Sequence, residues 1–173
     1  DYLRLVDCLR SYRSDIAFSS DFIVGFPGET DAEFEATLTL AGRVGFAQAY
    51  SFKYSARPGT PAASMGNQVD EAVKTERLME LQSLLSDQQK KFNDSMIGRC
   101  LEVLVEKPGR HPGQLVGRSP YLQAVHVKPG NGAVSLGIGD LIKVKVVDSC
   151  ANSLGGLVDN SLCADTLTKE HAF

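Results

Sequence analysis

The ten residues from Asp21 to Thr30, Asp-Phe-Ile-Val-Gly-Phe-Pro-Gly-Glu-Thr, constrain the fold more than any other stretch of the chain. An apolar run leads into a turn with proline and glycine, and the turn leads into a helix N-cap at Thr30, where Glu33 completes a capping box. A buried strand that passes directly into a helix is the repeating unit of α/β proteins. The stretch therefore predicts a β/α unit with a ligand-facing loop at the C-terminal end of its strand.

Apolar periodicity places further elements on both sides of this unit. Residues 1–13 are predicted to form a helix with an apolar face of Leu5, Leu9 and Tyr12, and residues 16–26 a buried strand. The helix after Thr30 ends near Gly42 and Gly45, and residues 46–54 form the next strand. A β-α-β order implies a parallel sheet, and the preceding helix suggests part of a β/α barrel.

The second strand carries its side chains on two different faces. Tyr50, Phe52 and Tyr54 alternate with Ala49, Ser51 and Lys53. In a barrel the bulky face would pack on the outer helices, so that Lys53 would point into the lumen, where a charge needs a partner or a ligand. Arg57, in the loop just after this strand, would lie on the same barrel face as Gly25, and its guanidinium suits a carboxylate or phosphate.

The period of the pattern changes to two from residue 99 onward. A loop at residues 55–68 and a long helix at about 70–95 come first. Leu101, Val103 and Val105 then alternate with Glu102, Leu104 and Glu106. Further strands are predicted near 114–118, 122–128, 141–147 and 154–158. Five short strands in about 60 residues predict a small closed barrel of the OB type. The predicted organisation is 1–68 barrel portion, 69–95 connecting helix, 96–158 β-module and 159–173 loose tail.

Charge divides the chain in the same way. The net charge is −3, but residues 96–147 carry 7 Lys and Arg against 3 Asp and Glu, between two acidic segments. A basic module with flat side chains is a pattern that small barrels use on single-stranded RNA, although a scattered solvated surface would give similar counts. The RNA-binding candidates are Arg99, Lys107, Arg110, His111, Arg118, Tyr121, His126 and Lys128.

Other classes of function are disfavoured by the sequence. No apolar run approaches the roughly 20 residues of a membrane helix. The four cysteines contain no CxxC pair, which predicts reduced thiols in a cytoplasmic protein and no complete metal or iron–sulfur site.

In the Gly25–Glu29 turn, the glycines let the backbone approach a ligand and Pro27 fixes the loop, but a plain strand-to-helix connection remains an alternative. Glu29 is either a catalytic or ribose-binding carboxylate or a partner of the helix dipole.

Three segments together resemble the radical-SAM methylthiotransferases. Asp21–Thr30 resembles the fifth barrel strand of that family, and Ser51-Phe-Lys-Tyr-Ser-Ala-Arg-Pro-Gly-Thr-Pro-Ala-Ala63 resembles the sixth strand and its loop. Gly117-Arg-Ser-Pro-Tyr-Leu-Gln-Ala-Val-His126 resembles the TRAM domain of the tRNA-modifying, MiaB-type branch, and Asn152-Ser-Leu-Gly-Gly156 its last strand. The resemblance covers nearly all of residues 1–158.

This resemblance implies a specific activity. Enzymes of the family attach a methylthio group to C2 of isopentenyl-adenosine beside the tRNA anticodon, using S-adenosylmethionine and two [4Fe-4S] clusters, and the TRAM module holds the RNA. The implied partner is the anticodon stem-loop of tRNA, bound by a monomeric enzyme. By the same resemblance, the adenosylmethionine pocket is lined by Gly25, Phe26, Pro27, Gly28, Glu29, Lys53, Arg57 and Pro58.

The sequence departs from the family pattern in lacking all six cluster cysteines, which lie upstream in the family. We therefore expect a C-terminal fragment: the end of a radical-SAM β/α barrel followed by a five-stranded TRAM barrel, inactive alone and limited to tRNA binding. Two alternatives remain open. One is the sister branch that methylthiolates an aspartate of a ribosomal protein, which the basic module disfavours. The other is a non-enzymatic RNA-binding module formed by residues 96–158.

Overall fold

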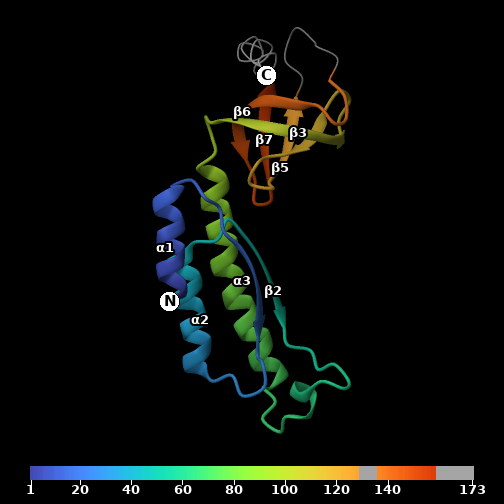
Figure 1. The fold of residues 1–173 in the computed structure, drawn as a ribbon. Helices are drawn as coiled ribbons and strands as arrows, with labels where there is room; N and C mark the ends of the chain where they lie inside the picture. The colour runs from blue at the N-terminus through green and yellow to red at the C-terminus, as the bar shows by residue number, and fades with distance from the viewer. Residues whose placement is uncertain (129–135, 159–173) are drawn as a thin grey trace, which may run out of the picture. The chain divides into compact units, whose positions relative to one another are not determined.

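The computed structural model describes residues 1–128 and 136–158. The chain divides into two compact units, Asp1–Gln89 and the residues from Lys90 onward (Figure 1). The predicted tail at 159–173 lies outside the described residues. No helix in the described part is both long and apolar enough to cross a membrane.

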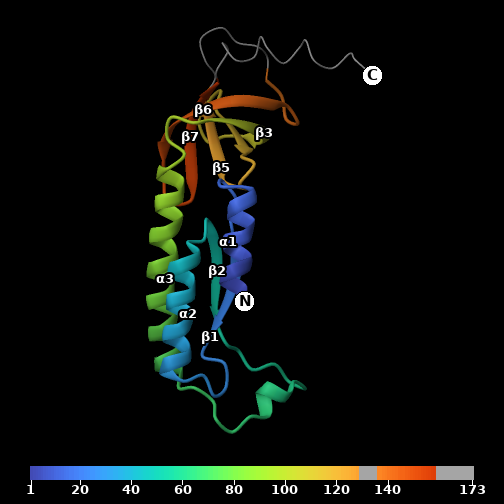
Figure 2. The same cartoon turned by 60° about the vertical axis from the view of Figure 1, so that its left-hand side comes forward.

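The first unit contains two β/α repeats preceded by a helix. Its parallel two-stranded sheet pairs β1 with β2, in a register that sets Phe22 opposite Ser51, and the two strands lie side by side in Figure 2. The capping box at Thr30 and Glu33 forms as predicted, and Gly45 ends the following helix in a left-handed conformation. The elements are α1 Tyr2–Tyr12, β1 Ser19–Val24, α2 Asp31–Val44, β2 Gln48–Lys53, a 3-10 turn Pro61–Ser64, and α3 Glu71–Asp94.

One face of this sheet packs on the helices. Val24 on β1, Phe34 on α2 and Leu81 on α3 belong to a single buried cluster, and Figure 1 shows the helices on one side of the strands. The predicted face of α1 is wrong, because Leu5 and Tyr12 are exposed and the buried residue of that helix is Val6. A helix that packs through one residue per two turns gives too weak a pattern to identify its buried side.

The orientation predicted for β2 is also wrong. Tyr50 and Phe52 are 56% and 55% exposed, whereas Ala49 packs against the helix-covered core. The ammonium of Lys53 lies on that same side, where it pairs with Glu71 of α3. The aromatic face, together with the exposed Ile23 of β1, is therefore the uncovered face of the sheet.

The second unit is a closed five-stranded barrel with the order β3-β4-β5-β7-β6. Most neighbours are antiparallel, but β5 and β7 pair in parallel, and this pair closes the barrel. Bulges in β3 and β6 shift the register and add the curvature that a small barrel needs. The strands are β3 Cys100–Pro108, β4 Leu115–Arg118, β5 Ala124–Lys128, β6 Leu141–Ser149 and β7 Ser153–Val158.

Alternating apolar residues fill the barrel interior. Val103, Val125, Val127 and Val144 are fully buried, as the period of two predicts. Glycines occupy two inward positions where no larger residue fits: a Cβ on Gly117 would lie 2.4 Å from the backbone oxygen of Leu104, and one on Gly156 would lie 2.2 Å from Val144. Both glycines are therefore required by packing.

A buried amide at the end of α3 ties the loops of the barrel together. Asn93 is 1% exposed. Its side-chain nitrogen donates to the carbonyls of Cys150 and Ala151, at 2.8 and 3.0 Å, and its oxygen accepts from Gln123 at 2.6 Å. The hydroxyl of Ser119 bonds to Gln123 in turn. The β6–β7 turn and the β4–β5 loop are thus held by one saturated polar network.

We predict that Gly117→Ala destabilises the barrel. The added methyl group would meet backbone, which cannot rotate away, so the free energy of unfolding should fall by about 3 kcal/mol, the upper end of typical overpacking costs. The change in unfolding free energy is measured by urea unfolding, with amide hydrogen exchange in the barrel strands as the readout. Gly137→Ala is the matched control, because its Cβ would lie 3.7 Å from the nearest atom; equal effects of the two substitutions would contradict the prediction.

Candidate nucleic-acid interface

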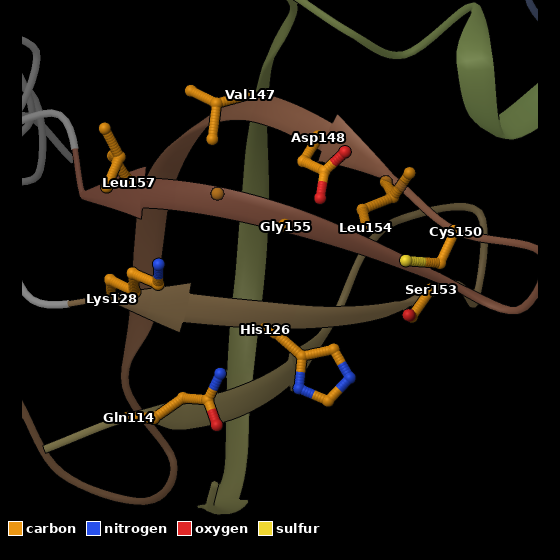
Figure 3. A pocket seen from close by; sticks show the side chains of 11 residues that line it. Gln114, His126, Lys128, Val147, Asp148, Cys150, Ser153, Leu154, Gly155 and Leu157 are labelled. Carbon is orange, nitrogen blue, oxygen red and sulfur yellow. The ribbon is translucent and has the colours of Figure 1, made fainter. Parts of the chain in front are cut away.

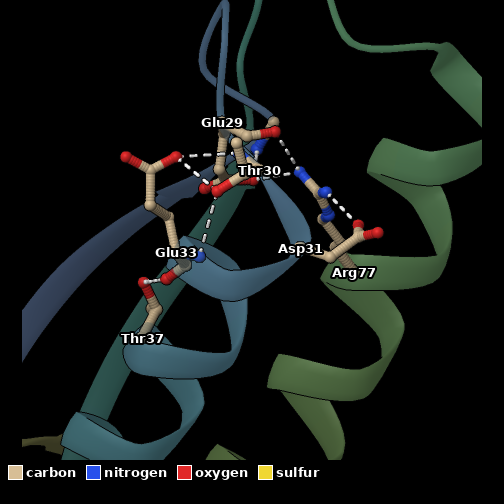
Figure 4. A network of polar contacts seen from close by, with 7 residues as sticks. Glu29, Thr30, Asp31, Glu33, Thr37 and Arg77 are labelled. Carbon is tan, nitrogen blue, oxygen red and sulfur yellow. Dashed lines mark hydrogen bonds and ion pairs between the residues drawn. The ribbon is translucent and has the colours of Figure 1, made fainter.

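The Gly25–Glu29 turn is fastened to α3 by charge. The carboxylate of Glu29, 12% exposed, accepts the backbone N–H of Gly25 at 2.7 Å and pairs with Arg77 at 2.6 Å. The other guanidinium nitrogen of Arg77 pairs with Asp31 at 2.6 Å, as Figure 4 shows. Burial disfavours the charged guanidinium, but its hydrogen bonds to Asp31 and Glu29 outweigh burial and raise the pKa of Arg77 above its usual value. Glu29 thus acts as a structural partner of the turn.

The two glycines of this turn also meet protein rather than open space. Gly25 and Gly28 both have positive φ, at 72° and 85°. A Cβ on Gly25 would lie 2.4 Å from the side chain of Lys74, and one on Gly28 the same distance from Asn67. Their small size is explained by the packing of the turn against α3 and the segment before it.

The remaining predicted pocket residues are spread along the end of the sheet. Phe26 packs edge-to-face on Tyr54, with 5.2 Å between ring centroids, while Arg57 and Pro58 are exposed. The hydroxyl of Tyr54 is buried without a hydrogen-bond partner in the described part of the chain. Lys53 is held by Glu71 on the helix side of the sheet. Cofactor binding by Gly25–Glu29, Lys53, Arg57 and Pro58 stays a prediction.

The described residues do not fit an iron–sulfur cluster. No group of three or more His, Cys, Asp or Glu side chains converges in residues 1–128 and 136–158. The thiols of Cys8, Cys100 and Cys150 are free and exposed. No chemical step through a cluster can be assigned to these residues.

Two of the RNA-binding candidates on the barrel are engaged by the protein itself. Arg118 donates to both carboxylate oxygens of Glu106, at 3.2 and 3.1 Å, and to the carbonyl of Leu122. The ring of Tyr121, predicted as a stacking platform, packs edge-to-face on Phe92 against the barrel core. Both residues shape the β4–β5 loop, and RNA binding by Arg118 and Tyr121 stays a prediction.

The other candidates lie on the surface, and some of them meet at one groove. Arg99, Lys107, Arg110 and His111 are exposed. The side chain of Gln114 accepts the backbone N–H groups of Arg110 and His111, at 3.1 and 3.3 Å. Gln114 also lines the groove that contains His126 and Lys128. The β3–β4 turn with its two basic residues is therefore anchored at the edge of this groove.

The groove runs over the outer surface of β5, β7 and β6 and has a volume of about 400 Å³. Figure 3 shows His126 and Lys128 along β5, Asp148 along β6, and Gly155 on β7 between them. Its lining residues are Gln114, His126, Lys128, Val147, Asp148, Cys150, Ser153, Leu154, Gly155, Gly156 and Leu157.

Sequence reasoning identifies His126 and Lys128 but misses Asp148, Ser153 and Gly155. The outward direction of His126 follows from its place between Val125 and Val127, and the structure confirms it. The contribution of β7 could not be anticipated, because its parallel pairing with β5 joins residues 29 positions apart in the sequence, such as His126 and Gly155. The glycine pair at 155 and 156 was the only available signal, since glycine in a strand marks a close approach or a hollow.

We predict that Arg77→Met loosens the Gly25–Glu29 turn. Removing the guanidinium leaves the buried Glu29 carboxylate unpaired, which should cost about 3–5 kcal/mol of unfolding free energy. Amide exchange at Gly25, whose N–H bonds to Glu29, reports the loss directly. Arg43→Met, at an exposed position in the last turn of α2, is the control; a slow-exchanging Gly25 amide in the Arg77 variant would contradict the structural role.

Comparison with known proteins agrees with this architecture. The TRAM domain model matches residues 94–158. The chain is 60% identical over 161 residues to the tRNA-2-methylthio-N(6)-dimethylallyladenosine synthase of Maricaulis maris (strain MCS10). The match covers 93% of the chain and 34% of that protein, so the chain spans about a third of the length of this curated relative. By sequence, the chain is therefore a relative of the MiaB-type tRNA methylthiotransferases across both of its units, and it contains a TRAM domain.

Proposed function

We propose that the chain is the C-terminal part of an enzyme that methylthiolates an adenosine of tRNA, and that its barrel binds that RNA. The 60% identity carries the proposal, because it extends over 93% of the chain and so includes both the β/α unit and the barrel. The TRAM domain supplies the RNA-binding role. The ribosomal-protein branch of the family is the alternative, and the exposed basic residues of the barrel disfavour it.

The finer chemistry belongs to the same proposal. The target is C2 of isopentenyl-adenosine in the anticodon stem-loop, and the reaction uses S-adenosylmethionine and two [4Fe-4S] clusters bound outside the described residues. The Gly25–Glu29 turn and the Arg57–Pro58 loop contribute to the adenosylmethionine pocket of a monomeric, cytoplasmic enzyme. Within this chain, Arg77 holds the turn in place through Glu29.

The enzymatic part is tested with the full-length protein that contains this chain. After reconstitution with iron and sulfide, it should convert isopentenyl-adenosine in tRNA to its methylthio derivative, detected by mass spectrometry of the digested nucleosides. Adenosine lacking the isopentenyl group and the ribosomal protein are the control substrates. An iron-loaded protein that leaves tRNA unmodified would overturn the proposal.

The RNA-binding part of the proposal predicts that the affinity of the isolated 173-residue chain for tRNA depends on salt concentration. Its log affinity for tRNA should fall linearly with log salt concentration, by about 0.7–0.9 for each phosphate contacted. Arg110→Ala should reduce this slope by about one such contact, because the exposed Arg110 side chain lies on the barrel turn held by Gln114. Arg43→Ala, which removes an equal charge from the first unit, should not. An unchanged slope in the Arg110 variant would remove this turn from the interface.

A further inference from the structure

We propose that the groove over β5, β7 and β6 binds a single unpaired nucleobase of the RNA and selects bases that carry an amino group, guanine above all. The inference rests on the proposed RNA-binding function and adds a site and a preference to it. The groove is outlined by His126 on one side, Asp148 on the other and Gly155 beneath (Figure 3).

The floor of the groove exists because β7 lacks a side chain there. Gly155 pairs with His126 of β5 and with Asp148 of β6, so these three residues form one row across the barrel surface. Strands lie about 4.8 Å apart, so the two flanking backbones are separated by about 10 Å. A Cβ on Gly155 would lie 3.2 Å from the Cβ and 3.9 Å from a carboxylate oxygen of Asp148, so the side chain of Asp148 borders the space over Gly155. A planar base can therefore lie over the backbone of Gly155 on the β5 side, with its edge toward Asp148.

His126 provides an aromatic surface beside this floor. Its side chain is exposed, and in Figure 3 its ring is seen nearly face-on beside β5, on the side toward Gln114. A base stacked on the imidazole lies over β5, with its edge directed across Gly155 toward β6. Stacking of a base on a flat side chain contributes about 1–3 kcal/mol without regard to sequence. This contact therefore supplies affinity, and the selectivity has to come from the far side of the groove.

Asp148 provides the selective group at that far side. One of its carboxylate oxygens accepts the backbone N–H of Ser149 at 2.9 Å, which orients the side chain. The other has no hydrogen-bond partner within the described residues. A carboxylate only accepts hydrogen bonds, so it favours bases whose edge presents donors. Guanine presents adjacent N1–H and N2–H groups, whereas uracil presents a single N–H between two acceptor oxygens.

The rim of the groove suits the ribose-phosphate backbone. Lys128 lies one outward position beyond His126 on β5 and places an ammonium at the end of the groove. Val147 and Leu157 are half exposed and give the rim apolar surface, while Ser153 adds a hydroxyl. A concave site with apolar walls and a few polar groups is the usual form of a small-ligand pocket.

The test uses the 173-residue chain and labelled RNA heptamers UUUXUUU with X as G, A, C or U. We expect UUUGUUU to bind about 5- to 100-fold tighter than UUUUUUU, the range for a well-formed bidentate contact to a base. Asp148→Asn should remove this preference, and any gain in affinity from the lost negative charge should be the same for all four heptamers. Glu102→Gln, an exposed carboxylate on β3, is the matched control and should retain the preference.

Two further measurements place the base in the groove. His126→Ala should weaken binding of all four heptamers about 5-fold or more, and His126→Phe should restore it, because a ring is kept for stacking.

Cys150 lines the groove, whereas Cys8 and Cys100 do not. Saturating UUUGUUU should therefore slow alkylation of Cys150 but not of Cys8 or Cys100, as read by peptide mass spectrometry.

The outcomes separate this inference from the proposed function. If tRNA and the heptamers bind but show no preference at X and give no protection of Cys150, the groove is not a base site and RNA binding itself stands. If neither tRNA nor any heptamer binds at low salt, the RNA-binding function fails and the inference fails with it. A preference for UUUUUUU that Asp148→Asn leaves intact would also overturn the proposed selectivity.

Discussion

Closure of the five-stranded barrel by the parallel pairing of β5 with β7 is the constraint on which the second unit depends. The strands can close only because glycine occupies positions 117 and 156, where any side chain would collide with backbone or with Val144. Closure brings β5 and β6 to the two sides of β7. The groove is a direct consequence, since it needs His126 and Asp148 on strands that flank the same glycine.

The polar network around Asn93 fixes the loops that connect the strands of the closed barrel. A buried amide with every hydrogen-bonding group satisfied holds a defined geometry, whereas an unsatisfied one would cost about 1–3 kcal/mol. Because Asn93 bonds to the β6–β7 turn and to Gln123, the two loops next to the groove are fixed together. Arg118 and Tyr121, which the sequence marks as RNA contacts, contribute to the same rigidity through Glu106 and Phe92. The loop thus stabilises the barrel that we propose to bind RNA.

In the first unit, a buried ion pair holds the Gly25–Glu29 turn in place. Arg77 is buried between Glu29 and the ring of Phe34, and it fixes the turn that the sequence identifies as the ligand loop. A turn held in this way can present backbone groups to a ligand without reorganisation, which lowers the cost of binding. The uncovered face of the sheet, with Ile23, Tyr50 and Phe52, leaves large apolar groups unpacked.

The order and type of the elements follow from local signals in the sequence. Apolar periods of 3.6 and 2, the capping box at Thr30 and the turn glycines are local signals, and they predicted three helices and seven strands close to their observed bounds. The sequence also predicted the outward position of His126 and the TRAM resemblance that residues 94–158 confirm. Radical-SAM barrel membership of the first unit stays a prediction.

Which faces are covered, and which polar groups are free, depends on contacts between residues that are distant in the sequence. Alternation along β2 defines two faces but does not say which one meets the helices, so Lys53 was assigned to the wrong side. The ion pair of Arg118 and the groove partners Asp148 and Gly155 join residues distant in sequence. Such contacts arise from strand pairing and barrel closure, and a local pattern carries no information about either.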